Sequence, residues 1–481
     1  MAFCPERPAR WYSRVHVRFW DVGIVTNLLA VVAILALGSL VVRVVPALRR
    51  LAVPPAIIAG VLGLVLGPSV LGVLPTDPEL LEIVVYHSFA LVFIAVGLQS
   101  ASSAGQRAKS ASSLAVAIPT FAIGQALLGF GLLAGWWLLT ATPLHPGFAL
   151  MIPLGFSQGP GQALSLGGAW ESQGLADGAQ IGLAFAAMGF LYCIVFGIPL
   201  VGYARRRGWI EASAADAPES VDTDTPVVHR ASGVFEPLST QLVLVGTVYL
   251  GVFGVLSLLS APLPADHPLQ ATVWGFHFIV GAGLSIGTRR VATRFRWTSA
   301  FDDDLLARIS VVAVDVTTAT AIAAVELEVI TRWLAPILVF TLCAGVLTLL
   351  ASIWMARRAF VQTPFAHGLA VFGMSTGTIS TGLALLRMID PQLRGPVARN
   401  VVVGAAASVP LMVPLFVAVI PFAVWQWPRG WVPSLLWPTL ALVVYAVALA
   451  IAWRKITPAR WLRPVWSMWP PEPPSSPKPP P

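Results

Sequence analysis

The stretch that decides the fold of this chain is Phe372–Asp390, FGMSTGTISTGLALLRMID, which is apolar enough for a membrane and yet interrupted by glycines and hydroxyl groups. Hydrocarbon offers no partner for a free backbone amide or carbonyl, so such an interruption at membrane depth is stable only against other protein or a cavity. The stretch therefore predicts two half-helices separated by a break that faces a binding site. The hydroxyl residues around the break are Ser375, Thr376, Thr378, Ser380 and Thr381.

A second interrupted stretch, Gly155–Trp170, reads GFSQGPGQALSLGGAW. Its centre, Gly159–Gly161, is Gly-Pro-Gly and cannot continue a helix, because proline lacks the amide donor and glycine adopts unusual backbone angles. Gln158 and Gln162 bring amide groups to this break. Two interrupted apolar segments in corresponding places of two halves are typical of a transporter's binding site. The alternative is that the small residues only permit a turn and close helix packing.

Composition places the whole chain in a membrane. Of 481 residues 57% are hydrophobic and 11% are charged, whereas a soluble protein carries about 25% charged residues. The net charge of +8 comes from loops between apolar runs, which argues against nucleic-acid binding. The three cysteines are scattered, so the sequence predicts no transition-metal site. The sequence also contains no nucleophile–base arrangement that would indicate an enzyme. We expect an all-α polytopic membrane protein.

The apolar runs, each near the about 20 residues that span a bilayer, occur in the same order twice. We expect about five transmembrane helices and one re-entrant segment in each half, followed by one extra C-terminal helix. The predicted parts are a basic N-terminal segment (1–20), a first transmembrane repeat (21–204), a cytoplasmic linker (205–237), a second repeat (238–425), the extra helix (432–453) and a disordered Pro-rich tail (465–481).

Loop charges predict how the halves are oriented. If both interrupted stretches enter and leave the membrane on one side, almost all basic loops face the cytoplasm, as the positive-inside rule requires. The halves then have opposite orientations, which is an inverted-topology repeat. The basic segment 1–20 is the exception, because this arrangement places it outside. The basic loops contain Arg49, Arg107, Arg205, Arg289, Arg357 and Arg394.

Two charged residues stand out within or beside the apolar runs. FIAVGLQSAS (Phe93–Ser102) aligns with VVAVDVTTAT (Val311–Thr320), and this places Gly97 opposite Asp315. Asp315 is the only acidic residue deep in an apolar run, so it is a candidate cation ligand or proton carrier, or else it pairs with an arginine. Arg387 ends the second half-helix and either binds a carboxylate or anchors the helix at the membrane surface.

The residue types at the two breaks predict two kinds of site. Free amides at a helix start suit an anion, and freed carbonyls with hydroxyls suit a hard cation such as Na⁺. The predicted substrate-binding residues are Gln158, Gly159, Gly161, Gln162, Thr376, Gly377, Thr378 and Arg387. The predicted ion-binding residues are Ser375, Thr376, Thr378, Thr381 and Asp315.

Several motifs together resemble the bacterial glutamate–sodium symporter family, in a divergent branch. They are Val53–Gly67, Phe93–Gln99, Gly155–Glu171, Ile181–Phe190 and Thr376–Pro391. The resemblance implies two inverted five-helix repeats with re-entrant segments, a homodimer in the inner membrane, and elevator-like motion. It also implies that Na⁺ and an amino acid meet between the re-entrant tips, with no other cofactor. The family's Gly-Gly-His-Gly-Thr pattern has Gln158 in place of its histidine here, so glutamate itself is one option among similar carboxylates.

The sequence leaves three functions open. The first is Na⁺-coupled symport of glutamate or a similar small anionic amino acid or carboxylate. The second is a monovalent cation/proton antiporter that uses Asp315, since Ala59–Gly72 also resembles a segment of such antiporters. The third is a non-transporting membrane scaffold or sensor whose linker and tail bind partners.

Overall fold

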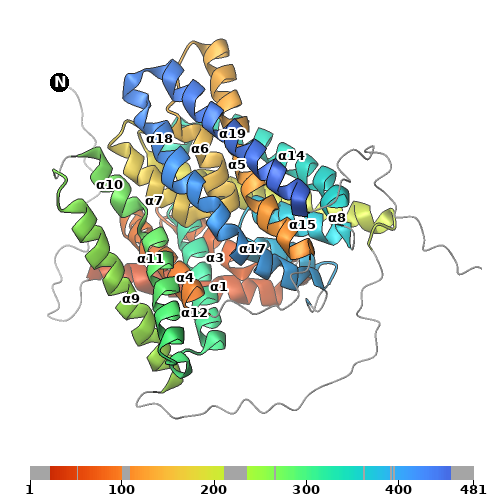
Figure 1. Ribbon diagram of the computed structural model, residues 1–481. Coiled ribbons are helices and arrows are strands. Elements are labelled where there is room, and N and C mark those ends of the chain that lie inside the picture. Colours follow the sequence, from red (N-terminus) through yellow and green to blue (C-terminus); the bar gives the residue numbers. More distant parts are fainter. Residues whose placement is uncertain are drawn as a thin grey trace, which may run out of the picture.

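The computed structural model describes residues 22–50, 53–99, 109–210, 236–264, 267–360, 363–390, 393 and 396–456, and these form helices joined by short connections (Figure 1). The predicted N-terminal segment, most of the predicted linker and the predicted tail lie outside the described residues.

The first half of the chain begins with long apolar helices and ends with a hairpin and one more long helix. Its elements are α1 (Val22–Val44), α2 (Pro46–Arg50), α3 (Pro55–Leu66), α4 (Pro78–Leu98), α5 (Lys109–Thr140), α6 (Gly147–Ile152), the π-helix η2 (Pro153–Gln158), α7 (Pro160–Glu171) and α8 (Gly178–Arg206).

The second half follows a similar order. Its elements are α9 (Pro237–Ser260), α10 (Pro268–Gly275), α11 (His277–Arg294), the short turn η4 (Thr298–Ala300), α12 (Asp303–Ala323), α13 (Leu327–Arg332), α14 (Leu334–Ala359), α15 (Pro364–Ser375), α16 (Ile379–Arg387), α17 (Pro396–Pro414), η5 (Leu415–Val419), α18 (Ile420–Trp425), η6 (Trp427–Arg429) and α19 (Trp431–Ile456). The last of these, α19, occupies the place of the predicted extra helix.

Within the described ranges, nine helices are long and apolar enough to cross a membrane, or ten if the bent pair α10–α11 is one span. The chain is therefore a multi-pass, all-helical membrane protein. The long helices are α1, α4, α5, α8, α9, α12, α14, the continuous run 396–429 and α19.

The second apolar run of each half differs from the sequence expectation. In the first half the apolar residues 54–74 would be long enough to span the membrane, but the helix α3 ends at Leu66 and Gly67 is extended. In the second half the run bends by 48° between α10 and α11. At this bend the Tyr86 hydroxyl donates to the Trp274 carbonyl at 2.6 Å, and the Phe276 amide donates to the same carbonyl.

The helices pack in two groups, visible in Figure 1. In one group, α4 packs against α12, α3 packs against α12, and α11 packs against α4 and α9. The other group holds the interrupted segments together with α5, α8, α14, α17 and α19, and it contains the largest cluster of buried side chains. Thus α4 of the first half contacts α11 of the second half, and α12 of the second half contacts α3 of the first half.

Candidate functional site

The first interrupted stretch forms a helical hairpin. A Cβ on Gly147, at the start of α6, would lie 3.2 Å from the ring of Trp170, near the end of α7, so the two ends of the hairpin meet. The break falls at Gly159, whose φ of 96° favours glycine, and Pro160 begins α7. The break predicted from the Gly-Pro-Gly triplet is thus found in the structure.

The second interrupted stretch forms another helical hairpin. Its first half-helix, α15, ends at Ser375 and its second, α16, begins at Ile379. The two half-helices approach closely at two glycines: a Cβ on Gly373 would lie 2.7 Å from the Cα of Gly382. These glycines therefore serve packing, whereas the hydroxyl residues lie at the break itself.

The helix α8 runs past the first hairpin from its base towards its tip. At the start of α8, a Cβ on Gly178 would lie 2.2 Å from the Gly167 carbonyl oxygen in α7. Two turns further along, the Cβ of Phe185 lies 2.8 Å from the Cβ position of Gly155, close to the break. The first hairpin therefore lies beside the first part of α8.

The same helix then runs past the second hairpin, in the reverse order. A Cβ on Gly189 would lie 2.5 Å from the Thr376 carbonyl oxygen at the break, and one on Gly197 would lie 2.8 Å from Leu385 in α16. Because α8 has 29 residues, it is about 43 Å long. The two hairpins therefore approach from opposite ends of α8, and their breaks meet near its middle.

The tips of the hairpins touch each other. Gly159 is the N-cap of α7 and Thr378 is the N-cap of α16, and a Cβ on Gly159 would lie 3.0 Å from the methyl carbon of Thr378. Two helix N-termini therefore converge on one place. At the start of α16 the Thr378 amide already donates to the Thr381 hydroxyl at 2.8 Å, so it is chiefly the positive ends of the two helix dipoles that make the place suitable for an anion.

A glutamine on α5 joins both tips. The Gln125 amide donates to the Ser375 carbonyl at 2.7 Å and to the Thr348 hydroxyl at 3.0 Å. Its oxygen accepts a hydrogen bond of 2.6 Å from Ser157 in the first hairpin. Gln125 was not among the predicted site residues, although it is a rare amide within an apolar run, and its importance depends on partners that lie far away in sequence.

Carbonyl oxygens gather where α15 ends. The carbonyls of Phe372 and Gly373 accept hydrogen bonds from the hydroxyls of Thr376 and Thr381, both at 2.8 Å, and the Ser375 carbonyl accepts the glutamine bond described above. These carbonyls are at the negative end of the helix dipole. These three carbonyl oxygens, together with the hydroxyls of Thr376 and Thr381, are the kind of ligands that suit a hard cation.

The thiol of Cys193 completes the wall behind the second tip. It lies on α8, is buried, and contacts the hydroxyls of Thr376 and Thr381. Its position makes it part of the polar cluster at this tip.

The glutamines predicted at the first tip lie side by side. Gln162 donates to the Gln158 oxygen at 3.4 Å, and the oxygen of Gln162 is buried without a hydrogen-bond partner among the described residues. The first turn of α7 also contacts α4, which belongs to the helix group without the hairpins. A Cβ on Gly161 would lie 2.1 Å from the Phe89 ring of α4. The first tip therefore lies at the boundary between the two groups.

Two predicted site residues are not brought to the tips. Arg387 is exposed in the last turn of α16, and nine residues of helix from Thr378 correspond to about 13 Å. Asp315 is half-buried in the middle of α12, which packs mainly on α3 and α4, and it makes no hydrogen bond or ion pair within the described ranges.

Charges of opposite sign mark the two ends of α8. At its start, Asp177 pairs with Arg332 at 2.9 Å. Burial raises the pKa of Glu326 there, and nearby carboxylates raise it further. At its end, Arg205 and Arg206 occupy the last turn.

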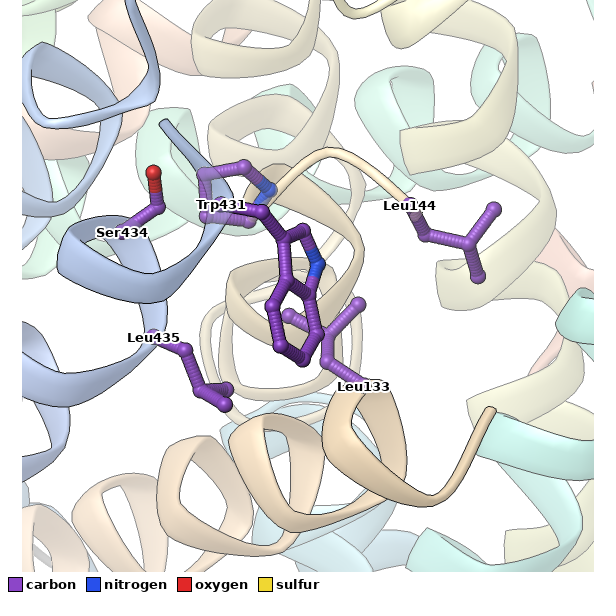
Figure 2. A pocket seen from close by; sticks show the side chains of 6 residues that line it. Leu133, Leu144, Trp431, Ser434 and Leu435 are labelled. Carbon is purple, nitrogen blue, oxygen red and sulfur yellow. The ribbon is translucent and has the colours of Figure 1, made fainter. Parts of the chain in front are cut away.

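A shallow notch at the acidic end carries no site. Figure 2 shows the indole of Trp431 beside Leu133, Leu144 and Leu435, where α5 ends and α19 begins. The one hydroxyl in it, Ser434, already donates to the Gly430 carbonyl at 2.6 Å. The notch is apolar and lies apart from the hairpin tips.

Comparison of the chain with family models, curated proteins and solved structures finds no match. The functional argument therefore rests on the geometry of the hairpins.

Proposed function

We propose that this protein is a secondary active transporter that couples Na⁺ to the symport of glutamate or a similar small anionic amino acid or carboxylate across the inner membrane. The observation that carries the proposal is the contact between Gly159 and Thr378, which brings two helix N-termini together near the middle of α8. Interrupted helices that meet midway across a membrane are the usual binding site of secondary transporters.

The converging N-termini support an anionic group on the solute. The hairpin segments 147–170 and 364–387 contain no acidic residue, so no side chain of the hairpins carries a charge that repels a carboxylate. The oxygen of Gln162, which has no hydrogen-bond partner in the described part of the chain, lies beside the same break and suits the ammonium group of an amino acid. Predicted residues Gln158, Gly161 and Gly377 then shape the site rather than supply charge.

The end of α15 supports the coupling ion. Its carbonyls and the hydroxyls of Thr376 and Thr381 form a set of neutral oxygens, which suits a monovalent cation better than a transition metal. The cation lies at the tip of one hairpin and the solute between the tips, so each favours the bound position of the other.

We further propose that the two halves are inverted repeats and that the hairpin group moves against the other group. The reciprocal packing of α3 on α12 and of α11 on α4, with hairpins entering from opposite ends of α8, supports the repeat. In this proposal the protein is a homodimer whose interface is formed by the group that contains α3, α4, α9, α11 and α12, so that the hairpin group is free to move.

The alternative function is cation/proton antiport. The observation in its favour is Asp315, a half-buried carboxyl on a membrane-spanning helix without an ion-pair partner among the described residues. Intramembrane carboxyls often carry protons or cations. Antiport moves protons without an organic solute, which distinguishes it from symport.

Thermal unfolding of the purified chain tests the proposal. We expect L-glutamate, L-aspartate or a small dicarboxylate to raise the melting temperature in NaCl but not in choline chloride. A ligand at about 100 times its Kd adds about 2.7 kcal/mol of stability, which a melting curve resolves. A panel in which no anionic amino acid or carboxylate raises the melting temperature would contradict the proposed substrate class.

A further inference from the structure

Gln125 has three hydrogen-bond partners, and only one of them determines which way its amide group faces. The Ser157 and Thr348 hydroxyls can each donate or accept, so either would tolerate an exchange of the amide oxygen and nitrogen. The Ser375 carbonyl can only accept, and it lies 2.7 Å from the amide nitrogen. A half-turn of the amide would therefore break a single bond and place two oxygens face to face.

Two facing oxygens repel each other unless a cation lies between them. The Gln125 and Ser375 side chains are 2% and 3% exposed, and Thr348 is 1% exposed, so water does not screen this repulsion. The arrangement in the structure satisfies the Ser375 carbonyl without a cation, through the amide nitrogen. A bound cation would satisfy the turned arrangement equally well.

We propose that Gln125 is the positioning residue that couples the ion to the two hairpin tips, by turning its amide when Na⁺ binds at the end of α15. The inference rests on the Na⁺ coupling proposed above and adds the residue that transmits it. In one orientation the amide nitrogen holds the Ser375 carbonyl; in the other, the amide oxygen and that carbonyl both face Na⁺.

The turn changes the first hairpin as well as the second. Ser157 donates to the Gln125 oxygen at 2.6 Å in the structure, and after the turn it accepts a bond from the amide nitrogen. Ser157 is the neighbour of Gln158 and lies two residues before the break at Gly159. Ion binding at one tip therefore alters the hydrogen bonding of the other tip, where the solute binds.

The test uses the purified full-length chain and Na⁺ alone as the probe. Melting temperatures are compared in NaCl and in choline chloride at equal ionic strength for the wild type and for Gln125→Met, which keeps the length of the side chain and removes the amide. Gln241→Met is the matched control, because Gln241 is 2% exposed on α9 and donates to the Ala300 carbonyl at 3.0 Å.

We expect the wild type and Gln241→Met to be stabilised by Na⁺ to the same extent, and Gln125→Met to show no difference between the two salts. If Gln125→Met retains the wild-type response, the inference is wrong while the Na⁺ coupling stands. If the wild type itself shows no response to Na⁺, the proposed coupling ion is wrong, and the inference falls with it.

Gln125→Glu provides a second test that does not depend on how well Gln125→Met folds. Protonated glutamate can donate to the Ser375 carbonyl and ionised glutamate cannot, so protons should compete with Na⁺ in this variant. Lowering the pH from about 8 to about 6 should raise its half-saturating Na⁺ concentration by about threefold or more, and leave the wild type nearly unchanged. The partners of Gln125 are uncharged, and the thiol of Cys193 beside Thr376 is present in both proteins. Equal pH dependence in the two would overturn the inference.

Discussion

Gly159 and Thr378 cap the first turns of α7 and α16 and touch at the tips of two hairpins that enter from opposite ends of α8. The contact leaves room for a hydrogen atom at position 159 and no more, because a Cβ there would lie 3.0 Å from the Thr378 methyl group. Two half-helices from separate parts of the chain thus share one site.

Gly159→Ala should strongly reduce transport. The φ of 96° strains an alanine, and the added methyl group presses on Thr378. We expect Na⁺-stimulated glutamate uptake to fall by about tenfold or more, since strain of about 1–3 kcal/mol at the tip changes its position. Gly131→Ala on α5 is the matched control, because nothing lies within 4 Å of its Cβ position. Uptake by Gly159→Ala at the level of the Gly131 variant would show that the tips do not meet in this way.

Gly161→Ala should be rescued by a smaller residue at position 89. The alanine Cβ would lie 2.1 Å from the Phe89 ring, so the single variant forces α4 away from the tip. Overpacking of this kind costs about 1–3 kcal/mol, and the double variant Gly161→Ala/Phe89→Ala removes the clash. A double-mutant cycle on melting temperature and uptake measures the coupling. Additive effects in that cycle would mean that the two residues are not in contact.

Thr376→Val should weaken Na⁺ dependence without loss of insertion. It removes the hydroxyl that donates to the Phe372 carbonyl and keeps the shape of the side chain. A lost hydrogen bond of about 1 kcal/mol predicts a half-saturating Na⁺ concentration raised by about five- to tenfold, and Thr378→Val should act in the same direction. Thr247→Val, which removes the same kind of bond on exposed α9, is the control. Unchanged Na⁺ affinity in both tip variants would move the ion site elsewhere, and Asp315 would be examined next.

Acid should destabilise the loop that begins the first hairpin. Burial lowers the pKa of His145 from 6.5 to about 4, so the unfolded chain binds a proton more readily than the folded one. The contribution is complete above about pH 6.5 and is lost as the pH falls towards about 4, by up to about 3 kcal/mol. His145→Asn keeps an acceptor for the Gly147 amide, which donates at 3.0 Å. Its melting temperature should fall less steeply over this range than that of the wild type; parallel curves would contradict the assignment to His145.

Asp315→Asn distinguishes the two proposed functions. Since Asp315 lies on α12, away from the hydroxyl cluster, symport should survive the change with less than about a threefold effect on uptake. A pH-sensitive dye in vesicles reports proton movement on addition of NaCl or KCl without organic solute. Proton movement that the wild type performs and Asp315→Asn lacks would favour the antiporter instead.

The breaks at Gly159 and at residues 376–378 could be predicted because glycine, proline and hydroxyl residues interrupt a helix by local chemistry alone. The bend at Phe276 could not, because the contact found there, from the Tyr86 hydroxyl to the Trp274 carbonyl, joins residues 188 positions apart. Gln125 was missed for a similar reason: its three partners lie on three different elements. Arg387 has suitable chemistry for a carboxylate, but the length of α16 carries it away from the tips.

Solute accumulation in liposomes tests the central claim most directly. Purified protein is reconstituted, and uptake of radiolabelled L-glutamate, L-aspartate and small dicarboxylates is followed with NaCl or choline chloride outside. The meeting of two helix N-termini beside the carbonyl end of α15 predicts that at least one of these anions accumulates above its external concentration only with Na⁺ outside, and that Gly159→Ala prevents it. Accumulation that is equal in choline chloride, or proton exchange without any anion uptake, would contradict the account.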